Sequence, residues 1–135
     1  MAAGKYSFAI EQGATLNFEL AYKDSNNDPI DLTGYQARMQ LRPNKGSDTV
    51  FITLSSSLDP NDDTGLNMSG SSGINPPESG TIGVHISAFS SSQLTFDTAV
   101  YDLEIATGSS YPTVTRLLEG NIQLVKEVTS GSYDG

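Results

Sequence analysis

The sequence predicts a single all-β domain built as an antiparallel sandwich, and three observations predict it. Apolar and polar residues alternate with a period of two in most apolar segments, which is typical of strands with one buried face. Segments rich in Gly, Asn, Asp, Ser and Pro separate these strands at regular spacing, and no helical period is long enough to organise the fold. Seven to eight strands with one short helical crossover favour an immunoglobulin-like sandwich. In this chain of 135 residues we assign the sandwich to residues 1–129 and a polar tail to residues 130–135.

The predicted strands follow the alternating segments in order along the chain. They lie within residues 6–10, 16–22, 35–42, 82–87, 101–105 and 121–124. Gly120 interrupts the last apolar segment and indicates a bulge or a bend. From the alternation we expect one set of side chains to form the core: Tyr6, Phe8, Phe18, Leu20, Met39, Ile52, Val84, Ile86, Tyr101, Leu103, Ile122 and Leu124.

Two regions depart from the alternating pattern. Residues 55–80 are rich in turn-forming residues, and we expect a short extra strand at Leu66–Met68 with ordered loops around it, since a structureless loop of this length is unusual. Residues 88–96 predict one helical turn that crosses between strands, with its apolar ends in the core. Between two of the strands, Pro43–Gly46 has the composition of a four-residue hairpin turn.

Charge and composition exclude several classes of function. Sixteen acidic residues outnumber seven basic ones, and the formal net charge of −9 repels phosphate backbones and anionic membranes. We therefore expect no binding to nucleic acid or to membranes. The chain has no cysteine, which excludes disulfides and cysteine nucleophiles. Its first ten residues lack the apolar core of a signal peptide, so we expect synthesis in a cytoplasm.

The candidate catalytic and metal-binding residues have simpler structural explanations. The single histidine, His85, alternates with core residues and should lie on the opposite face, with no marked nucleophile and carboxylate beside it. Residues 24–28 and 59–63 have the D-x-N-x-D spacing of calcium loops, but the glycine and glutamate expected further along are missing. Asp and Asn also cluster in ordinary turns. We expect no catalytic site, no cofactor and no metal.

Three groups of segments carry a family resemblance. They are Tyr6–Gly13 with Leu16–Leu20, then Asp28–Tyr35 with Ala37–Arg42, and then Val100–Ile105 with Val114–Gly120 and Val125–Thr129. In this order they resemble small virion proteins of tailed phages, especially of T4-like phages that infect cyanobacteria. The same order is similar to the N-terminal immunoglobulin-like module of phage baseplate upper proteins, and the resemblance spans nearly the whole chain.

The resemblance implies a non-enzymatic structural protein of a tailed-phage virion, with protein–protein assembly in the tail, baseplate or neck as its function. Its implied partners are other virion proteins, with copies of the same chain as a further partner. The resemblance also implies an unusual backbone angle at Gly34 and a tyrosine corner at Tyr101, in which the phenol bonds upstream backbone. The sequence covers the sandwich but not the receptor-binding-protein-docking part of a baseplate upper protein. A capsid decoration protein and a carbohydrate-binding module of a host-recognition apparatus are the alternatives.

We expect the long loop and the termini to contact partners, because a lone domain has little reason to display apolar residues there. The expected contact residues are Leu66, Met68, Ile74, Pro76, Pro77 and Tyr133. The alternative is that Leu66 and Met68 pair onto the sheet and that the tail is a frayed end.

Overall fold

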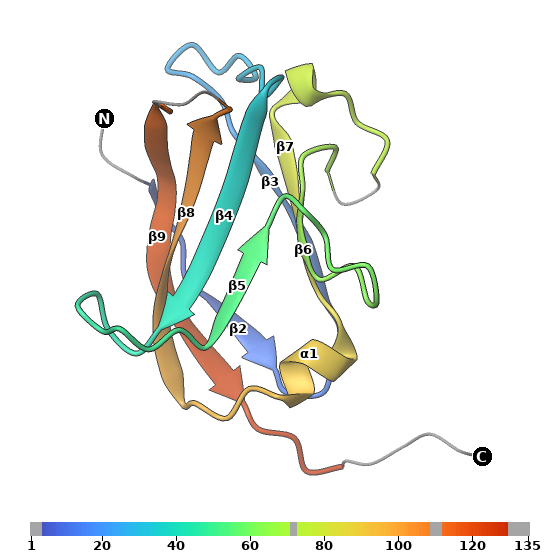
Figure 1. Ribbon diagram of the computed structural model, residues 1–135, viewed down its shortest axis with the longest axis vertical. Coiled ribbons are helices and arrows are strands. Elements are labelled where there is room, and N and C mark those ends of the chain that lie inside the picture. The colour runs from blue at the N-terminus through green and yellow to red at the C-terminus, as the bar shows by residue number, and fades with distance from the viewer. Residues whose placement is uncertain (1–3, 71–72, 109–111, 130–135) are drawn as a thin grey trace.

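The computed structural model describes residues 4–70, 73–108 and 112–129, which form two β-sheets packed face to face (Figure 1). The larger sheet has the strand order β1-β9-β8-β4-β5, with β2 also paired to β9, and the smaller sheet has the order β3-β7-β6. The strands are β1 Gly4–Lys5, β2 Phe8–Glu11, β3 Leu16–Ala21, β4 Tyr35–Arg42, β5 Ile52–Ser55, β6 Gly65–Asn67, β7 Thr81–Ile86, β8 Thr98–Thr107 and β9 Val114–Val125; the helices are the 3-10 turn η1 Pro77–Ser79 and α1 Ala88–Ser92.

This strand order is that of an immunoglobulin sandwich of the variable type, which confirms the predicted fold class. The order β9-β8-β4-β5 corresponds to the G-F-C-C′ sheet and β3-β7-β6 to the B-E-D sheet. The N-terminal strands β1 and β2 pair in parallel with β9, whereas every other ladder of the described residues is antiparallel. The described residues form nine strands rather than seven or eight, in part because the chain between Gly4 and Glu11 is divided at Tyr6 and Ser7.

Most of the predicted core is confirmed. Seven of the expected residues are buried: Met39, Val84, Ile86, Tyr101, Leu103, Ile122 and Leu124. Phe8, Phe18, Leu20 and Ile52 are only partly buried and pack against the core from outside. Tyr6 was predicted wrongly, since its side chain is 43% exposed. It lies at the division between β1 and β2, where the alternation no longer fixes which face a side chain occupies.

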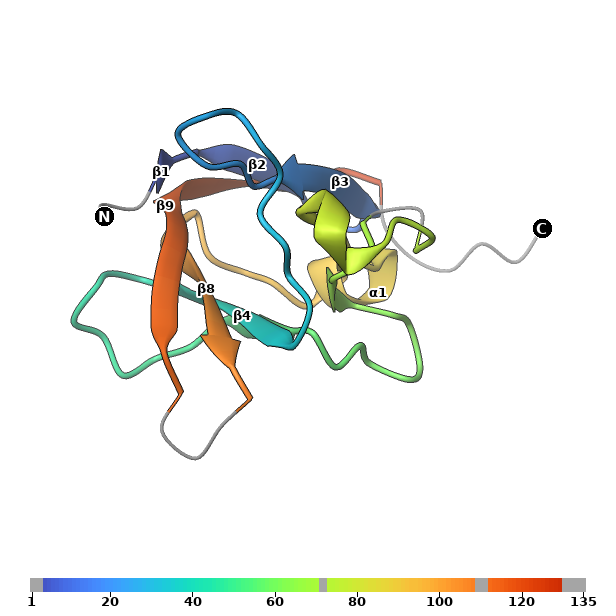
Figure 2. The same ribbon diagram turned by 90° about the horizontal axis from the view of Figure 1, so that it is seen from above.

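Two contacts close the sides of the sandwich. On one side β2 lies beside β3 (Figure 2), and the ring of Phe8 meets that of Phe18 edge on, with centroids 5.1 Å apart. On the other side the end of β5 approaches β6, because Gly65 leaves room for the Ser55 carbonyl. The short strand β6, predicted at Leu66–Met68, is confirmed one residue earlier.

The helical crossover between β7 and β8 is confirmed as α1. Ser87 caps its first turn by accepting a hydrogen bond from the backbone N–H of Ser90. Leu94 and Phe96 are buried as expected, whereas Phe89 is 71% exposed and not in the core. No helix of the described residues is long and apolar enough to span a bilayer.

The connections between strands follow the predicted turn chemistry in part. Gly13 and Gly34 adopt positive φ angles of 82° and 81°, so the expected unusual backbone at Gly34 is present. The connection from β4 to β5 spans residues 43–51 and is longer than a four-residue hairpin turn, although a turn does close between Asn44 and Ser47.

Gly120 is not the site of a bulge, which was one of the two predicted alternatives, a bulge or a bend. The irregularity of β9 lies at Leu117, because Leu103 pairs with Leu118 while Glu104 pairs with Arg116. A Cβ atom on Gly120 would lie 2.0 Å from the Tyr6 carbonyl oxygen, so glycine allows the N-terminal segment to cross β9 closely.

The phenol of Tyr101 holds the same segment in place. Its hydroxyl donates to the Tyr6 carbonyl at 2.5 Å. The bond reaches the N-terminal strands and not the crossover of residues 94–99, so the geometry differs from that of a tyrosine corner. Burial raises the pKa of this phenol to about 12, with the neighbouring Tyr6 adding to the shift.

Candidate interaction surfaces

The expected contact residues of the long loop do not form one exposed surface. Leu66 is fully buried in the core and pairs onto β7, as the alternative expects, whereas Met68 lies beyond the end of β6 and is partly buried against the core. Ile74 is 83% exposed and Pro76 is exposed, but Pro77 is half-buried and begins η1. Leu66 is therefore corrected from a contact residue to a core residue. Tyr133 lies outside the described residues.

Hydrogen bonds within the loop and to neighbouring segments hold it in place. The carbonyl of Pro77 accepts from the backbone N–H of Leu32, which ties η1 to the connection before β4. The side chain of Asn67 accepts from the N–H of Ser69, and the Asn75 amide donates to Thr81. The apolar residues that the described part of this loop exposes to solvent are Pro60, Ile74 and Pro76.

A carboxylate attaches the same loop to the helical crossover. Asp62 accepts hydrogen bonds from the hydroxyls of Ser87 and Ser90, at 2.5 Å and 2.7 Å, and from the N–H of Thr64 at 3.1 Å. These donors, with Ser87 contributing most, hold the pKa of Asp62 well below its ordinary range. The carboxylate of Asp62 therefore holds the loop against the first turn of α1, because it accepts hydrogen bonds from both.

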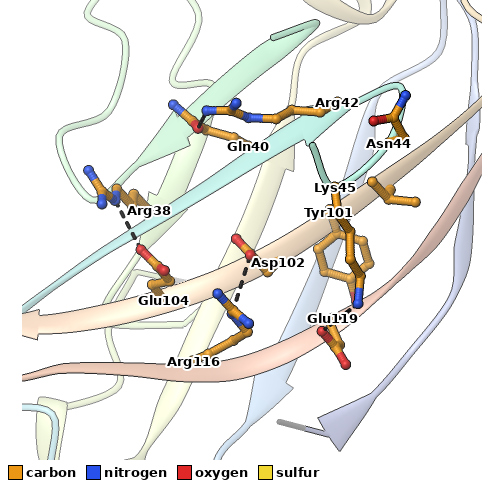
Figure 3. A pocket seen from close by; sticks show the side chains of 11 residues that line it. Arg38, Gln40, Arg42, Asn44, Lys45, Tyr101, Asp102, Glu104, Arg116 and Glu119 are labelled. Atoms are coloured by element: carbon orange, nitrogen blue, oxygen red, sulfur yellow. Dashed lines mark hydrogen bonds and ion pairs between the residues drawn. The ribbon is translucent and has the colours of Figure 1, made fainter. Parts of the chain in front are cut away.

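The outer side of the larger sheet carries most of the positive charge of the chain (Figure 3). We name this surface the charged face; its ionic residues are Lys5, Arg38, Arg42, Lys45, Asp102, Glu104, Arg116 and Glu119. Five of the seven basic residues of the chain lie here, beside three of its sixteen acidic residues. They surround a shallow hollow of about 300 Å³, to which the amides of Gln40 and Asn44 add polar groups.

Strand register places the ionic groups of the charged face. Arg38, Glu104 and Arg116 stand in one row across β4, β8 and β9. The side chain of Arg38 pairs with Glu104 at 3.2 Å, and Arg116 pairs diagonally with Asp102 at 3.3 Å. Arg42 instead donates to the Ser47 carbonyl and is not in an ion pair within the described residues.

Glu119 connects the charged face to two other parts of the chain. Lys5 of β1 donates to one carboxylate oxygen, and Lys45 of the β4–β5 connection lies 3.5 Å from the other. The hydrogen bond from Lys5 lowers the pKa of Glu119, and the charge of Lys45 acts in the same direction. Both contacts therefore favour the ionised form of this carboxylate, which adds a negative charge to the cations of the face.

The residues first considered for catalysis and metal binding lie elsewhere. His85 points away from the core, as predicted, on the outer side of β7, where it lines a second hollow with Asn17 and Asp63. In the first D-x-N-x-D loop, the Asp24 carboxylate accepts from two backbone N–H groups of the same loop. Both loops are closed by such local bonds, since Asp59 accepts in the same way from Asn61.

The charged face was not identified from the sequence. The alternation of β4 does place Arg38 and Arg42 on a polar face, but it says nothing about what stands beside them. The pairing of Arg38 with Glu104 joins residues 66 positions apart in the chain. Only the register between β4 and β8 brings them together, and no local signal specifies that register.

Comparison with known proteins gives no relative from which to assign a role: no family model and no curated protein matches the chain.

Proposed function

We propose that this protein is a non-enzymatic structural component of a tailed-phage virion that acts by binding other virion proteins, in the tail, baseplate or neck. The assignment to a virion is motivated by the resemblance of the three segment groups. The observation that supports an assembly function is the charged face, in which most of the cations of an acidic chain gather on one sheet.

The position of these cations suits contact with a protein surface. Charged groups at interfaces steer association and fix orientation more than they add affinity. Arg38 and Arg116 are 69% and 51% exposed, so both guanidinium groups can exchange their present partners for groups of another protein. The interspersed carboxylates disfavour a phosphate backbone as the ligand.

The first test is the location of the protein in particles. Virions of the phage that encodes the chain are purified, probed with an antibody against it and imaged by cryo-EM. We expect labelling and sandwich-shaped density at the tail, baseplate or neck. Absence from purified particles would refute the proposal, and density on the capsid shell would favour the decoration alternative.

A pair of matched variants tests the charged face itself. Arg38→Gln with Arg116→Gln removes two cations from the face, whereas Lys23→Gln with Lys126→Gln removes the two cations that lie off it. Both pairs change the net charge equally. We expect only the first pair to lower occupancy in virions, with circular dichroism showing that both fold. Equal occupancy of both pairs would contradict a role for this face in assembly.

A further inference from the structure

The two outer surfaces of the sandwich differ in charge. The charged face has five cations and three carboxylates, whereas the outer side of the smaller sheet has the carboxylates of Glu19 and Asp63 and no Lys or Arg on β3, β6 or β7. An acidic protein with most of its positive charge on one sheet face has a directional field.

The opposite surface is the outer side of the smaller sheet. Its outward residues are Asn17 and Glu19 on β3, Asn67 on β6 and His85 on β7, with Asp63 beside them. We name these five residues the acidic face. Asn17, Asp63, Asn67 and His85 line a hollow of about 320 Å³. Because the sheets pack face to face, the charged face and the acidic face point in opposite directions.

We propose that the charged face binds the acidic face of a second copy of this chain, so that copies stack head to tail. This inference rests on the proposed function and names one partner for the surface described there. Charge complementarity carries it, since the surface with excess cations and the surface with excess carboxylates belong to the same molecule.

The alternative arrangement of two copies is electrostatically worse. A two-fold dimer through the charged face would bring together two surfaces that each have five cations and three carboxylates, so surfaces with an excess of the same charge would meet. A two-fold dimer through the acidic face would oppose like carboxylates. Head-to-tail contact avoids both, and heterologous contacts of this kind produce rings or filaments, which are the symmetric arrays that virions contain.

The test is sedimentation velocity of the full chain at rising concentration and at two salt levels. We expect concentration-dependent association at about 50 mM NaCl that weakens several-fold at about 500 mM, because surface charges are screened. Arg38→Gln with Arg116→Gln should weaken association roughly tenfold, and so should Glu19→Gln with Asp63→Asn. Lys23→Gln with Lys126→Gln should not weaken it. If the first pair does not fold, Lys45→Gln, at a side chain 78% exposed, replaces it.

Mixing the two weakened variants distinguishes a head-to-tail contact from a two-fold contact. Each keeps one intact face, so a head-to-tail contact predicts that the mixture forms dimers and stops there. A charged-face variant or an acidic-face variant that still dimerises alone as well as the unmodified chain would overturn the proposal, because a two-fold contact would then be responsible. A chain that stays monomeric at every concentration would also overturn it. The virion-labelling experiment is independent of both results, so the proposed function stands or fails separately.

Discussion

The two sheets of this sandwich share one apolar core but differ in the length of their strands and in how the shortest strand is held. In the larger sheet, β8 and β9 run for ten and twelve residues, and their alternate side chains form much of the apolar core. In the smaller sheet, β6 has three residues, and the loop before it is attached to α1 by the hydrogen bonds of Asp62. Alternation makes the larger sheet and the strands β3 and β7 visible in the sequence, whereas the short strand β6 depends on the burial of Leu66 and on polar contacts between distant segments.

The comparison predicts where substitutions cost most. Substitutions in the apolar packing of the larger sheet should lower the free energy of unfolding most. Substitutions at the close backbone contacts of its N-terminal edge should have the next largest effect. The contribution of the polar contacts in the smaller sheet should depend on pH. The ion pairs of the charged face should contribute least.

The largest effect is expected for Leu103→Ala on β8. Leu103 is fully buried, so its truncation removes apolar contacts and leaves a cavity, at a cost of about 2–5 kcal/mol in the free energy of unfolding. Urea denaturation measures it. Val114→Ala on β9, where the side chain is 51% exposed, is the control and should change stability by less than about 0.5 kcal/mol. Similar small values for both would mean that β8 does not form the core.

The next effect is expected for Gly120→Ala, which tests the N-terminal edge of the same sheet. The new Cβ would meet the Tyr6 carbonyl, so the segment must shift and its bond with the Tyr101 hydroxyl must weaken. We expect a loss of about 1–3 kcal/mol, as in other overpacked sites. Hydrogen exchange should also quicken at Tyr6, whose N–H bonds the Glu119 carbonyl.

Gly46→Ala provides the matched control for this prediction. A Cβ atom on Gly46 would have no neighbour closer than 3.9 Å, so the substitution should be nearly neutral. If the two substitutions cost the same, the close crossing of β9 by the N-terminal segment is contradicted.

The same two regions show why part of the molecule could be predicted and part could not. Alternation identified Met39, Val84 and Leu103 as core residues because a strand with one buried face repeats every two residues. It failed at Tyr6, where the strand is interrupted. Gly120 is required because the Tyr6 carbonyl, more than a hundred residues earlier in the chain, lies where a Cβ atom would be. The local sequence around Gly120 gives no sign of this contact.

The candidate surface illustrates the same limit. Apolar residues in the long loop suggested a contact site, yet Leu66 completes the core because β6 pairs with β7. The charged face depends on the register of β4, β8 and β9, which sets Arg38 beside Glu104 and Asp102 beside Arg116. Such pairings follow from tertiary structure and have no signature in any one strand.

Substitution of Asp62 tests the polar attachment of the smaller sheet. The pKa of Asp62 lies below its ordinary value in the folded chain, because Ser87, Ser90 and Thr64 donate to the carboxylate. Its contribution to stability is therefore present above about pH 4, the pKa of an unfolded Asp, and is lost as pH falls through the folded pKa. Asp62→Ala should lower Tm at pH 7, and the difference from the unmodified chain should shrink below about pH 4.

Thermal unfolding followed at several pH values measures this difference. Asp63→Asn, at an adjacent residue with a positive φ of 60° that Asn also tolerates, is the control and should follow the unmodified chain at every pH. Parallel curves for Asp62→Ala and the unmodified chain would show that the attachment does not depend on an ionised carboxylate.

The smallest effect is expected for the ion pair between Arg38 and Glu104 on the charged face. A double-mutant cycle with Arg38→Gln and Glu104→Gln measures the coupling, which should be about 0.2–1 kcal/mol because the Arg38 side chain is 69% exposed. Added salt should reduce it further. A small coupling means that the two side chains can bind groups of another protein instead of each other with little loss in the free energy of unfolding. Truncation of Leu103 beneath the same sheet, in contrast, should lower that free energy strongly. A coupling above about 2 kcal/mol, beyond the range of exposed pairs, would instead assign the pair to holding β4 against β8 and would contradict the charged face as a binding surface.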